Sequence, residues 1–253
     1  MVWGEPRVGA VNFVDARADA LHAAHRQLQG SAERLRRNLE DLSVRRAASC
    51  WSYADGPAQL AGRLLRDAAA CRRSLWHLSP EPLLESDAAV VPVELRTTRS
   101  IVDVRCAMPA KAVTGRPWLN LCLGRYSRVL IAPVLERVLL LDRSVVVFPG
   151  SLLPCGTQAF RATSDPETLA LTEILWRDTE RVGEAMHVHQ PDRRDDRRMA
   201  VLTSLCRGST DGQIARQLGV SVRLVEMDVQ HLKSLCGARS RTHLVARMLT
   251  GDG

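Results

Sequence analysis

Residues suited to DNA contact gather near the C-terminal end of the chain. The stretch GQIARQLGVSVRLVEMDVQHLKSL (212–235) holds two helical patterns separated by a Gly-Val-Ser turn. Arginine and lysine neutralise phosphate, and a glutamine on an outward helix face can form a bidentate pair with adenine. These residue types at this spacing are typical of a helix-turn-helix, whose second helix enters the major groove.

Two carboxylates in the second helix oppose this interpretation, because phosphate repels them. A carboxylate on a base edge can accept a hydrogen bond from cytosine N4, so Glu226 either reads sequence or weakens binding. We expect Asp228 to pair with Arg216 or Lys233 instead. The alternative is a degenerate module that is retained only for packing.

The net charge of the chain is concentrated in the same region. Residues 193–253 hold eleven basic and six acidic residues, so they carry +5 of the +7 total. A basic C-terminal module is the electrostatic footprint of nucleic-acid binding. The number of arginines alone is weaker evidence, because the whole chain uses arginine in place of lysine: it has only two lysines, Lys111 and Lys233.

The segment GSTDGQIARQLGVSVRLVEMDVQHLKSLCGARSR (208–241) resembles the C-terminal DNA-binding domain of LuxR-type (NarL/FixJ/GerE-like) regulators. The anchors, which match in register, are IARQL at 214–218, Val220-Ser221, Leu224-Val225 and GARSR at 237–241. The resemblance implies that residues 221–236 form the recognition helix. Glu226 and Asp228 depart from the family pattern, which commonly has a basic residue and a histidine there.

The resemblance also implies a role for each candidate residue of the interface. The N-terminal end of the recognition helix would present Ser221, Arg223 and Leu224, and its outward face Glu226, Met227 and Gln230. Met227 would contact a thymine methyl and Gln230 an adenine. The candidate phosphate contacts, which position the module without reading sequence, are Arg216, Lys233, Arg239 and Arg241.

These residues require four short helices to position them, and the pattern predicts those helices over residues 199–253. Gly208, Gly219 and Gly237 end successive helices, while Ser221 and Ser240 cap the helices that follow. The expected buried positions are Met199, Leu202, Leu205, Cys206, Ile214, Ala215, Leu218, Val225, Val229, Leu232, Cys236, Leu244, Val245 and Met248. The charged stretch 189–198 is predicted to be a linker.

Residues 51–188 read as an α/β domain. Strand-type runs lie at 74–79, 100–106, 127–133, 137–150 (two strands around an Asp142-Arg143-Ser144 turn) and 157–163. A helix is expected after the Gly56-Pro57 break, and another over 165–186 with Asp165 as N-cap and Pro166 at its first position. The apolar stripe of this second helix is expected to be Leu169, Ile174, Leu175, Val182 and Met186.

The segments PAQLAGRLLRDAAACRRSLWHLSP and RVLLLDRSVVVFP and the closing ILWRDTER helix are similar to the middle domain of actinobacterial LuxR-type and TrmB-like regulators. The resemblance implies a phospholipase-D-like fold without catalysis. Phospholipase-D chemistry needs H-x-K-x4-D, and the chain's one H-x-K, at His231 and Lys233, has Ala238 where Asp is required. We therefore expect no enzyme activity and no cofactor.

Other residues that could form a site have a simpler interpretation. His187 and His189 form an H-x-H without a third ligand nearby, so a solvated surface is expected and no metal. Seven dispersed cysteines without a C-x-x-C pair predict buried thiols in a reducing compartment. Four aromatic residues could line a ligand pocket, but lone aromatics at such spacings more often belong to the core. They are Trp76, Trp118, Trp176 and Tyr126.

Residues 14–45 predict one long helix. Val14, Leu21, Leu28, Leu35 and Leu42 recur every seven residues, with Ala18, His25, Ala32 and Leu39 four residues after the first four. This seam fits a dimerising coiled coil over residues 1–50, although Gly30 and His25 oppose it. A helix lying on its own domain fits equally well.

The sequence as a whole predicts a multidomain protein: a long N-terminal helix, an α/β phospholipase-D-like domain and an all-α LuxR-type helix-turn-helix. We expect a cytoplasmic, one-component, sequence-specific transcriptional regulator, because no secretory signal and no run of 18 apolar residues occurs. Its expected partners are double-stranded DNA, a second copy of the chain and an unidentified small-molecule or protein effector. The alternative is a ligand-binding or protein-interaction protein with a degenerate DNA-binding domain.

Overall fold

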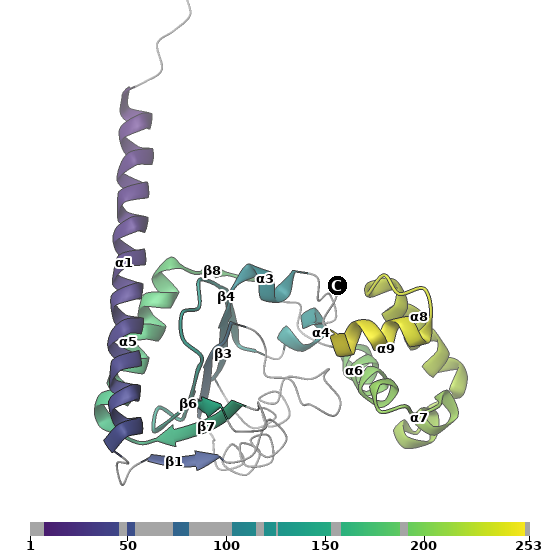
Figure 1. The fold of residues 1–253 in the computed structure, drawn as a ribbon. Helices are drawn as coiled ribbons and strands as arrows, with labels where there is room; N and C mark the ends of the chain where they lie inside the picture. The colour runs from purple at the N-terminus through teal and green to yellow at the C-terminus, as the bar shows by residue number, and fades with distance from the viewer. Residues whose placement is uncertain are drawn as a thin grey trace, which may run out of the picture.

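The computed structural model describes residues 8–45, 50–53, 73–80, 103–114, 119–124, 126–152, 158–187 and 192–250. A long N-terminal helix, a mixed sheet with helices on both sides, and a group of C-terminal helices make up these ranges (Figure 1). The helix predicted after Pro57 lies outside the described residues, as do Trp118 and His189. None of the described helices is long and apolar enough to cross a membrane.

The described strands form one eight-stranded sheet in the order β1-β7-β6-β5-β2-β3-β4-β8. The pairs β2–β3 and β3–β4 are parallel and the others antiparallel. All the predicted strands are present, but β1 and β8 were not expected from the sequence. The strands are β1 (Cys50–Tyr53), β2 (Ser74–Leu78), β3 (Asp103–Met108), β4 (Arg128–Ile131), β5 (Val138–Leu141), β6 (Val145–Leu152), β7 (Gln158–Thr163) and β8 (Glu184–Ala185).

The β5–β6 hairpin turns where the sequence predicted. Asp142 and Arg143 adopt φ values of 48° and 56°, the left-handed pair that a tight hairpin turn requires. Aspartate tolerates this region better than most residues. Its carboxylate also accepts hydrogen bonds from the backbone N–H groups of Arg73 and Ser74, at 2.8 and 2.9 Å. The turn therefore fixes the start of β2 beside β5.

The helices α1 (Val8–Arg45) and α5 (Pro166–Val182) cover one face of the sheet. Leu28, Ala32, Leu35 and Leu39 of α1 are buried in a core shared with α5 and the strands. Leu21 is 56 % exposed, and the N-terminal part of α1 extends beyond the domain (Figure 1). The C-terminal half of the heptad seam thus lies on its own domain, and the seam continues past it.

Helix α5 begins as predicted, but it ends at Val182 instead of residue 186, and it buries polar residues that the prediction did not include. Asp165 caps it by accepting from the backbone N–H of Thr168 at 2.8 Å, and Pro166 occupies the first position. Of the predicted stripe, Leu175 is buried and Leu169 and Val182 pack against the same core. Ile174 is only partly buried, and Met186 lies beyond the end of the helix, so the stripe was wrong at these two positions. Helix α5 is packed between the sheet and α1, and the hydroxyls of Thr172 and Thr179 donate to backbone carbonyls four residues earlier. The buried residues are Thr168, Thr172, Leu175, Trp176, Asp178 and Thr179.

The opposite face of the sheet packs against α3 (Ala110–Val113) and α4 (Leu119–Leu123). Tyr126 is buried in this core, and Trp76 and Trp176 are buried in the core on the α5 side. Helix α4 contacts α6, so the core on the α3–α4 side continues into the C-terminal helices. These helices lie on the side of the molecule opposite α1 (Figure 1).

The C-terminal module consists of α6 (Arg193–Cys206), α7 (Asp211–Leu218), α8 (Val222–Leu235) and α9 (Arg241–Thr250). Helix α6 begins six residues before Met199, so residues 193–198, predicted as linker, are helical. The physical reason is a capping box: the Asp192 side chain accepts from the N–H groups of Arg194 and Asp195, and Asp195 reaches back to the Asp192 N–H.

Candidate nucleic-acid interface

Local capping fixes the turn between α7 and α8. Thr210 caps α7 in a capping box with Gln213. Gly219 ends that helix at φ 66°, a left-handed conformation that favours glycine. Ser221 then caps α8 by accepting from the backbone N–H of Leu224 at 3.2 Å. The sequence analysis predicted the end at Gly219 and the cap at Ser221.

The inward faces of the module also agree with the prediction. Ile214, Val225, Leu232 and Leu244 are fully buried. The partly buried members are Cys206, Leu218 and Val245. Because these side chains fix how α8 is rotated, they also determine which of its residues point to solvent.

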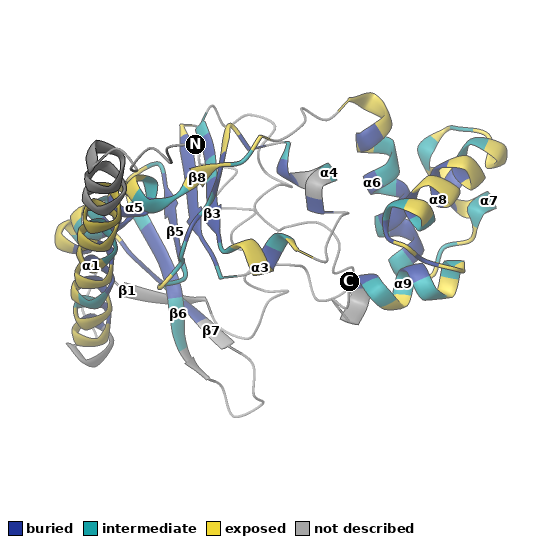
Figure 2. Ribbon diagram, turned by 90° about the horizontal axis from the view of Figure 1, so that it is seen from above, coloured by how far each residue is buried: buried dark blue, intermediate teal, exposed yellow. Residues whose placement is uncertain are grey.

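The outward face of α8 exposes four of the predicted DNA contacts, Arg223, Glu226, Met227 and Gln230. Exposed positions gather along α8 on the outer side of the module (Figure 2). The Met227 side chain is 62 % exposed, which is unusual for a large apolar residue, and Val222 is 44 % exposed. The sequence analysis did not single out Val222; its position directly after the cap was the available signal.

Asp228 lies on the inner side of α8 and is only 3 % exposed. Its carboxylate accepts from Arg197 Nε at 2.6 Å and Arg197 Nη2 at 3.1 Å, and Arg198 Nε lies 3.6 Å away. The hydrogen bond to Asp228 raises the pKa of the Arg197 guanidinium further above its usual value. The predicted pairing with Arg216 or Lys233 was wrong, because position 228 faces α6 beside the buried Val229.

This ion pair changes the charge that α8 offers to DNA. Arg197 and Arg198 belong to the stretch predicted as linker, so the sequence analysis missed them as partners. With Asp228 neutralised inside the module, Glu226 is the carboxylate that α8 exposes among the described residues. Of the two acidic residues that opposed DNA binding, only Glu226 still faces the solvent on α8.

The candidate phosphate contacts differ in their exposure and in whether they already have hydrogen-bond partners within the module. Arg216 and Arg239 are exposed. Lys233 is half-buried and donates to Gln230 Oε1 at 3.2 Å. Arg241 donates to the Asp211 carboxylate and to the Ser209 carbonyl, so it ties α9 to the start of α7. Arg241 is thereby a structural link, and the three others remain candidates for phosphate.

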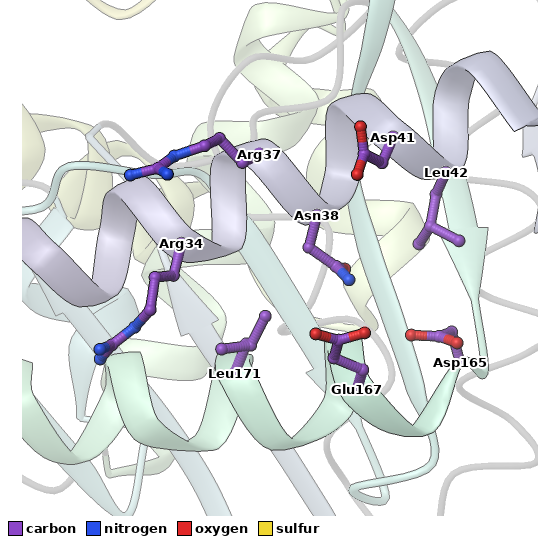
Figure 3. Close-up of a pocket in the computed structure, with 8 residues that line it drawn as sticks. All are labelled: Arg34, Arg37, Asn38, Asp41, Leu42, Asp165, Glu167 and Leu171. Atoms are coloured by element: carbon purple, nitrogen blue, oxygen red, sulfur yellow. The ribbon is translucent and has the colours of Figure 1, made fainter.

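A polar groove of about 450 Å³ lies between α1 and α5 (Figure 3). Two of its polar groups already stabilise the helix pair: Asp165 caps α5, and Asn38 Oδ1 accepts from Thr168 Oγ1 at 2.6 Å. Arg37 pairs with Glu33, and Arg34 donates to Ser31. The groove is therefore the seam between two helices. His187 is exposed, and the described residues hold no group of three His, Cys, Asp or Glu that could bind a metal.

No protein-family model and no curated protein matches the chain. Similar solved structures include Nuc of Salmonella typhimurium, a phospholipase D family member, at 11 % identity and a TM-score of 0.43; 55 % of this chain and 98 % of that chain are covered. NucT from Helicobacter pylori is similar at 11 % identity and a TM-score of 0.42, with the same coverage. TrmBL2, an archaeal chromatin protein with a novel mode of DNA binding, is similar at 11 % identity and a TM-score of 0.41. The similarity covers 71 % of this chain and 72 % of that chain.

These similarities concern part of the fold and say nothing of activity. One of the three proteins is named as a phospholipase D family member and another as an archaeal chromatin protein; none of the three is named as a LuxR-type regulator.

Proposed function

We propose that this protein is a sequence-specific, DNA-binding transcriptional regulator whose helix α8 enters the major groove. The observation that supports the proposal best is the sorting of side chains on α8. Its outer face presents Arg223, Met227 and Gln230, while the carboxylate of Asp228 is held inside by Arg197. The resemblance of residues 208–241 to LuxR-type domains supports the same assignment.

Each exposed residue has a separate role in this proposal. Gln230 pairs with adenine and Met227 packs on a thymine methyl, so these two carry sequence preference. Arg223 reaches a base or the nearest phosphate from the first turn of α8. Arg216 and Arg239 bind phosphate and so contribute affinity, salt dependence and orientation.

The proposed regulator acts as a homodimer. A pair of helix-turn-helix modules reads two half-sites about one helical turn apart, which requires two copies of α8. The heptad seam continues in α1 beyond the part that packs on α5, where Leu21 is exposed. Two copies of α1 would join there as a short coiled coil. The middle domain has no catalytic role in this proposal, because the sequence lacks H-x-K-x4-D.

One observation favours a second candidate function, a ligand-binding or protein-interaction protein with a degenerate DNA-binding module. Glu226 is exposed on the face of α8 that would meet DNA. A carboxylate there repels phosphate unless it accepts a hydrogen bond from a cytosine. The two candidates therefore differ in whether the full chain binds duplex DNA at all.

The test is selection of bound duplexes from a random pool with the full chain, followed by titration of the enriched duplex at two salt concentrations. We expect an enriched two-fold motif, whose affinity falls at least tenfold in Gln230→Ala on loss of a bidentate pair. Arg223→Gln should also weaken binding and reduce its salt dependence. Arg73→Gln, just before β2, removes the same charge from an exposed position outside the C-terminal module and should change neither. No enrichment with the folded chain would favour the second candidate.

A further inference from the structure

A cavity of about 170 Å³ lies on the α5 side of the sheet, apart from the proposed DNA contacts. It is larger than the roughly 30 Å³ that one water occupies. It is also smaller than the roughly 300 Å³ at which pockets for drug-sized ligands begin. A single-ring molecule is the size that fits. The walls combine two indoles with charged side chains: Trp76, Arg105, Arg143, Glu173, Trp176, Arg177 and Glu180.

The aromatic part of the wall is held rigidly. The rings of Trp76 and Trp176 lie 5.5 Å apart between centroids and are tilted by 35°. The guanidinium carbons of Arg105 and Arg143 lie 4.6 and 4.9 Å from the centroid of the Trp76 ring. Both indoles are mostly buried, at 8 % and 3 % exposure. Such a wall favours a flat, conjugated ligand, which can pack on indole and guanidinium surfaces.

Most polar groups of the wall already have partners. Trp76 Nε1 donates to Asp103 Oδ2 at 3.0 Å, and Arg105 Nε donates to the other oxygen of that carboxylate at 2.8 Å. Glu180 accepts from Arg105 at 3.3 Å and from Arg128 at 2.7 Å. Glu173 pairs with Arg143 at 2.9 Å. Both glutamates are thus neutralised before any ligand arrives.

Two donors of the wall remain uncommitted. The Trp176 Nε1 atom is buried and has no hydrogen-bond acceptor among the residues that the structure describes. A buried N–H without an acceptor is uncommon in native proteins, where a water or a ligand usually satisfies it. Arg177 is exposed at the same cavity. Three arginines against two glutamates also leave the wall with an excess of one positive charge.

We propose that this cavity, the tryptophan cavity, binds a small planar carboxylate. The conjugated ring lies against Trp76 and Trp176, and the carboxylate accepts from the Arg177 guanidinium and the Trp176 indole N–H. The two donors and the excess positive charge select an anion, and the volume restricts it to one ring. This site does not depend on whether α8 binds DNA.

The test is calorimetric titration of the full chain with benzoate, and with benzyl alcohol as the neutral probe of similar size. We expect saturable binding of benzoate at one site per chain and binding of benzyl alcohol at least tenfold weaker, because a hydrogen bond to a charged group contributes more than a neutral one. Arg177→Gln should weaken benzoate binding about tenfold or more. Trp176→Phe keeps the ring and removes only the unpartnered N–H, so the fold should survive and benzoate binding should weaken.

The matched control is Arg223→Gln, which removes an exposed arginine from α8 and should leave benzoate binding unchanged. Absence of benzoate binding by the folded wild-type chain would overturn the proposal and indicate a cavity that holds only water. Equal binding by wild type and Arg177→Gln would overturn it as well. Since the readout is ligand binding, the result stands whether or not the chain binds DNA.

Discussion

Two helix pairs at opposite sides of the molecule each close over a buried aspartate, and they hold it in different ways. Between α1 and α5, Asp178 accepts from Gln27 Nε2 at 2.9 Å and from Ser31 Oγ at 2.6 Å, and Arg181 lies 3.2 Å away. Between α6 and α8, Asp228 is held by Arg197, with Arg198 nearby. Both aspartates are nearly inaccessible, at 2 % and 3 % exposure.

The difference lies in what else closes each seam. The α1–α5 pair has a continuous apolar seam of Leu28, Leu35 and Leu39, and its aspartate is bound mainly by neutral donors. The α6–α8 pair instead brings two arginines to one carboxylate. Apolar side chains close both seams, and the second adds a charge pair between α6 and the proposed recognition helix. Four predictions test this difference between the two seams.

The largest effect is expected in the apolar seam. Leu35→Ala removes a fully buried side chain and should lower the free energy of unfolding by about 3 kcal/mol. Leu21→Ala, at an exposed position of the same heptad seam, should change it by less than about 0.5 kcal/mol at concentrations where the chain is monomeric. Urea denaturation measures both. Similar losses for the two variants would mean that the N-terminal half of α1 is also packed within one chain.

The second effect tests the charge pair. Arg197→Met leaves the buried Asp228 with Arg198 alone, so the C-terminal module should lose about 2–3 kcal/mol. Hydrogen exchange of the α8 amides reports this loss locally. The control is Glu226→Gln, which removes an exposed carboxylate from the same helix and should leave exchange unchanged. Combining Arg197→Met with Asp228→Leu should restore part of the stability, because no unpaired carboxylate then remains buried; no recovery would argue against the pairing.

The sequence predicted the two seams unequally, for a physical reason. Apolar periodicity shows which faces are buried, so the spacing predicted the C-terminal core and the seam of α1. It left open whether that seam packs on its own domain or on a second copy of the chain. A buried charge carries no periodic signal: Asp228 reads as surface until its partner is known, and that partner lies in a stretch whose charge suggested a linker. Asp178 and the threonines of α5 were missed likewise, because their partners are distant in sequence or are backbone carbonyls.

The residues of the candidate site also fall into two groups: those that local sequence predicts and those whose partners are distant in the chain. The turn, the caps and the outward Arg223, Met227 and Gln230 follow from local sequence, because capping and helical phase are local properties. The role of Arg241 does not, since its partners Asp211 and Ser209 lie about thirty residues earlier in the chain. The tryptophan cavity is assembled from β2, β3, the β5–β6 turn and α5. The sequence could therefore name Trp76 and Trp176 as possible pocket residues, but it could not show that they come together.

A smaller effect is expected from the neutral donors of the α1–α5 seam. Ser31→Ala removes the hydroxyl that donates to Asp178 and should cost about 1–2 kcal/mol. Its neighbour Gly30 provides a contrast of opposite sign: an added Cβ meets nothing within 4 Å, so Gly30→Ala should stabilise α1 by about 0.5–1 kcal/mol. Thermal denaturation distinguishes the two. A neutral Ser31→Ala would show that Gln27 and Arg181 suffice for Asp178.

The smallest effect concerns Cys206, near the end of α6, and tests how firmly that helix is packed. Burial raises the pKa of its thiol from 9.0 to about 11. Between these two values the unfolded thiol loses its proton while the folded one keeps it, so its contribution to stability is complete below pH 9 and is lost as pH rises to about 11.

At pH 8 the same shift lowers the thiolate fraction of Cys206 about a hundredfold, and only the thiolate reacts with alkylating reagents. Mass spectrometry of the peptide that contains Cys206 should therefore show iodoacetamide labelling at least a hundredfold slower in the folded chain than in urea. Equal rates would mean that α6 opens readily at its C-terminal end. In that case the apolar contacts of α6 would be weaker than its burial indicates, and Arg197 and Arg198, at the other end of α6, would hold Asp228 of α8 from a loosely packed helix.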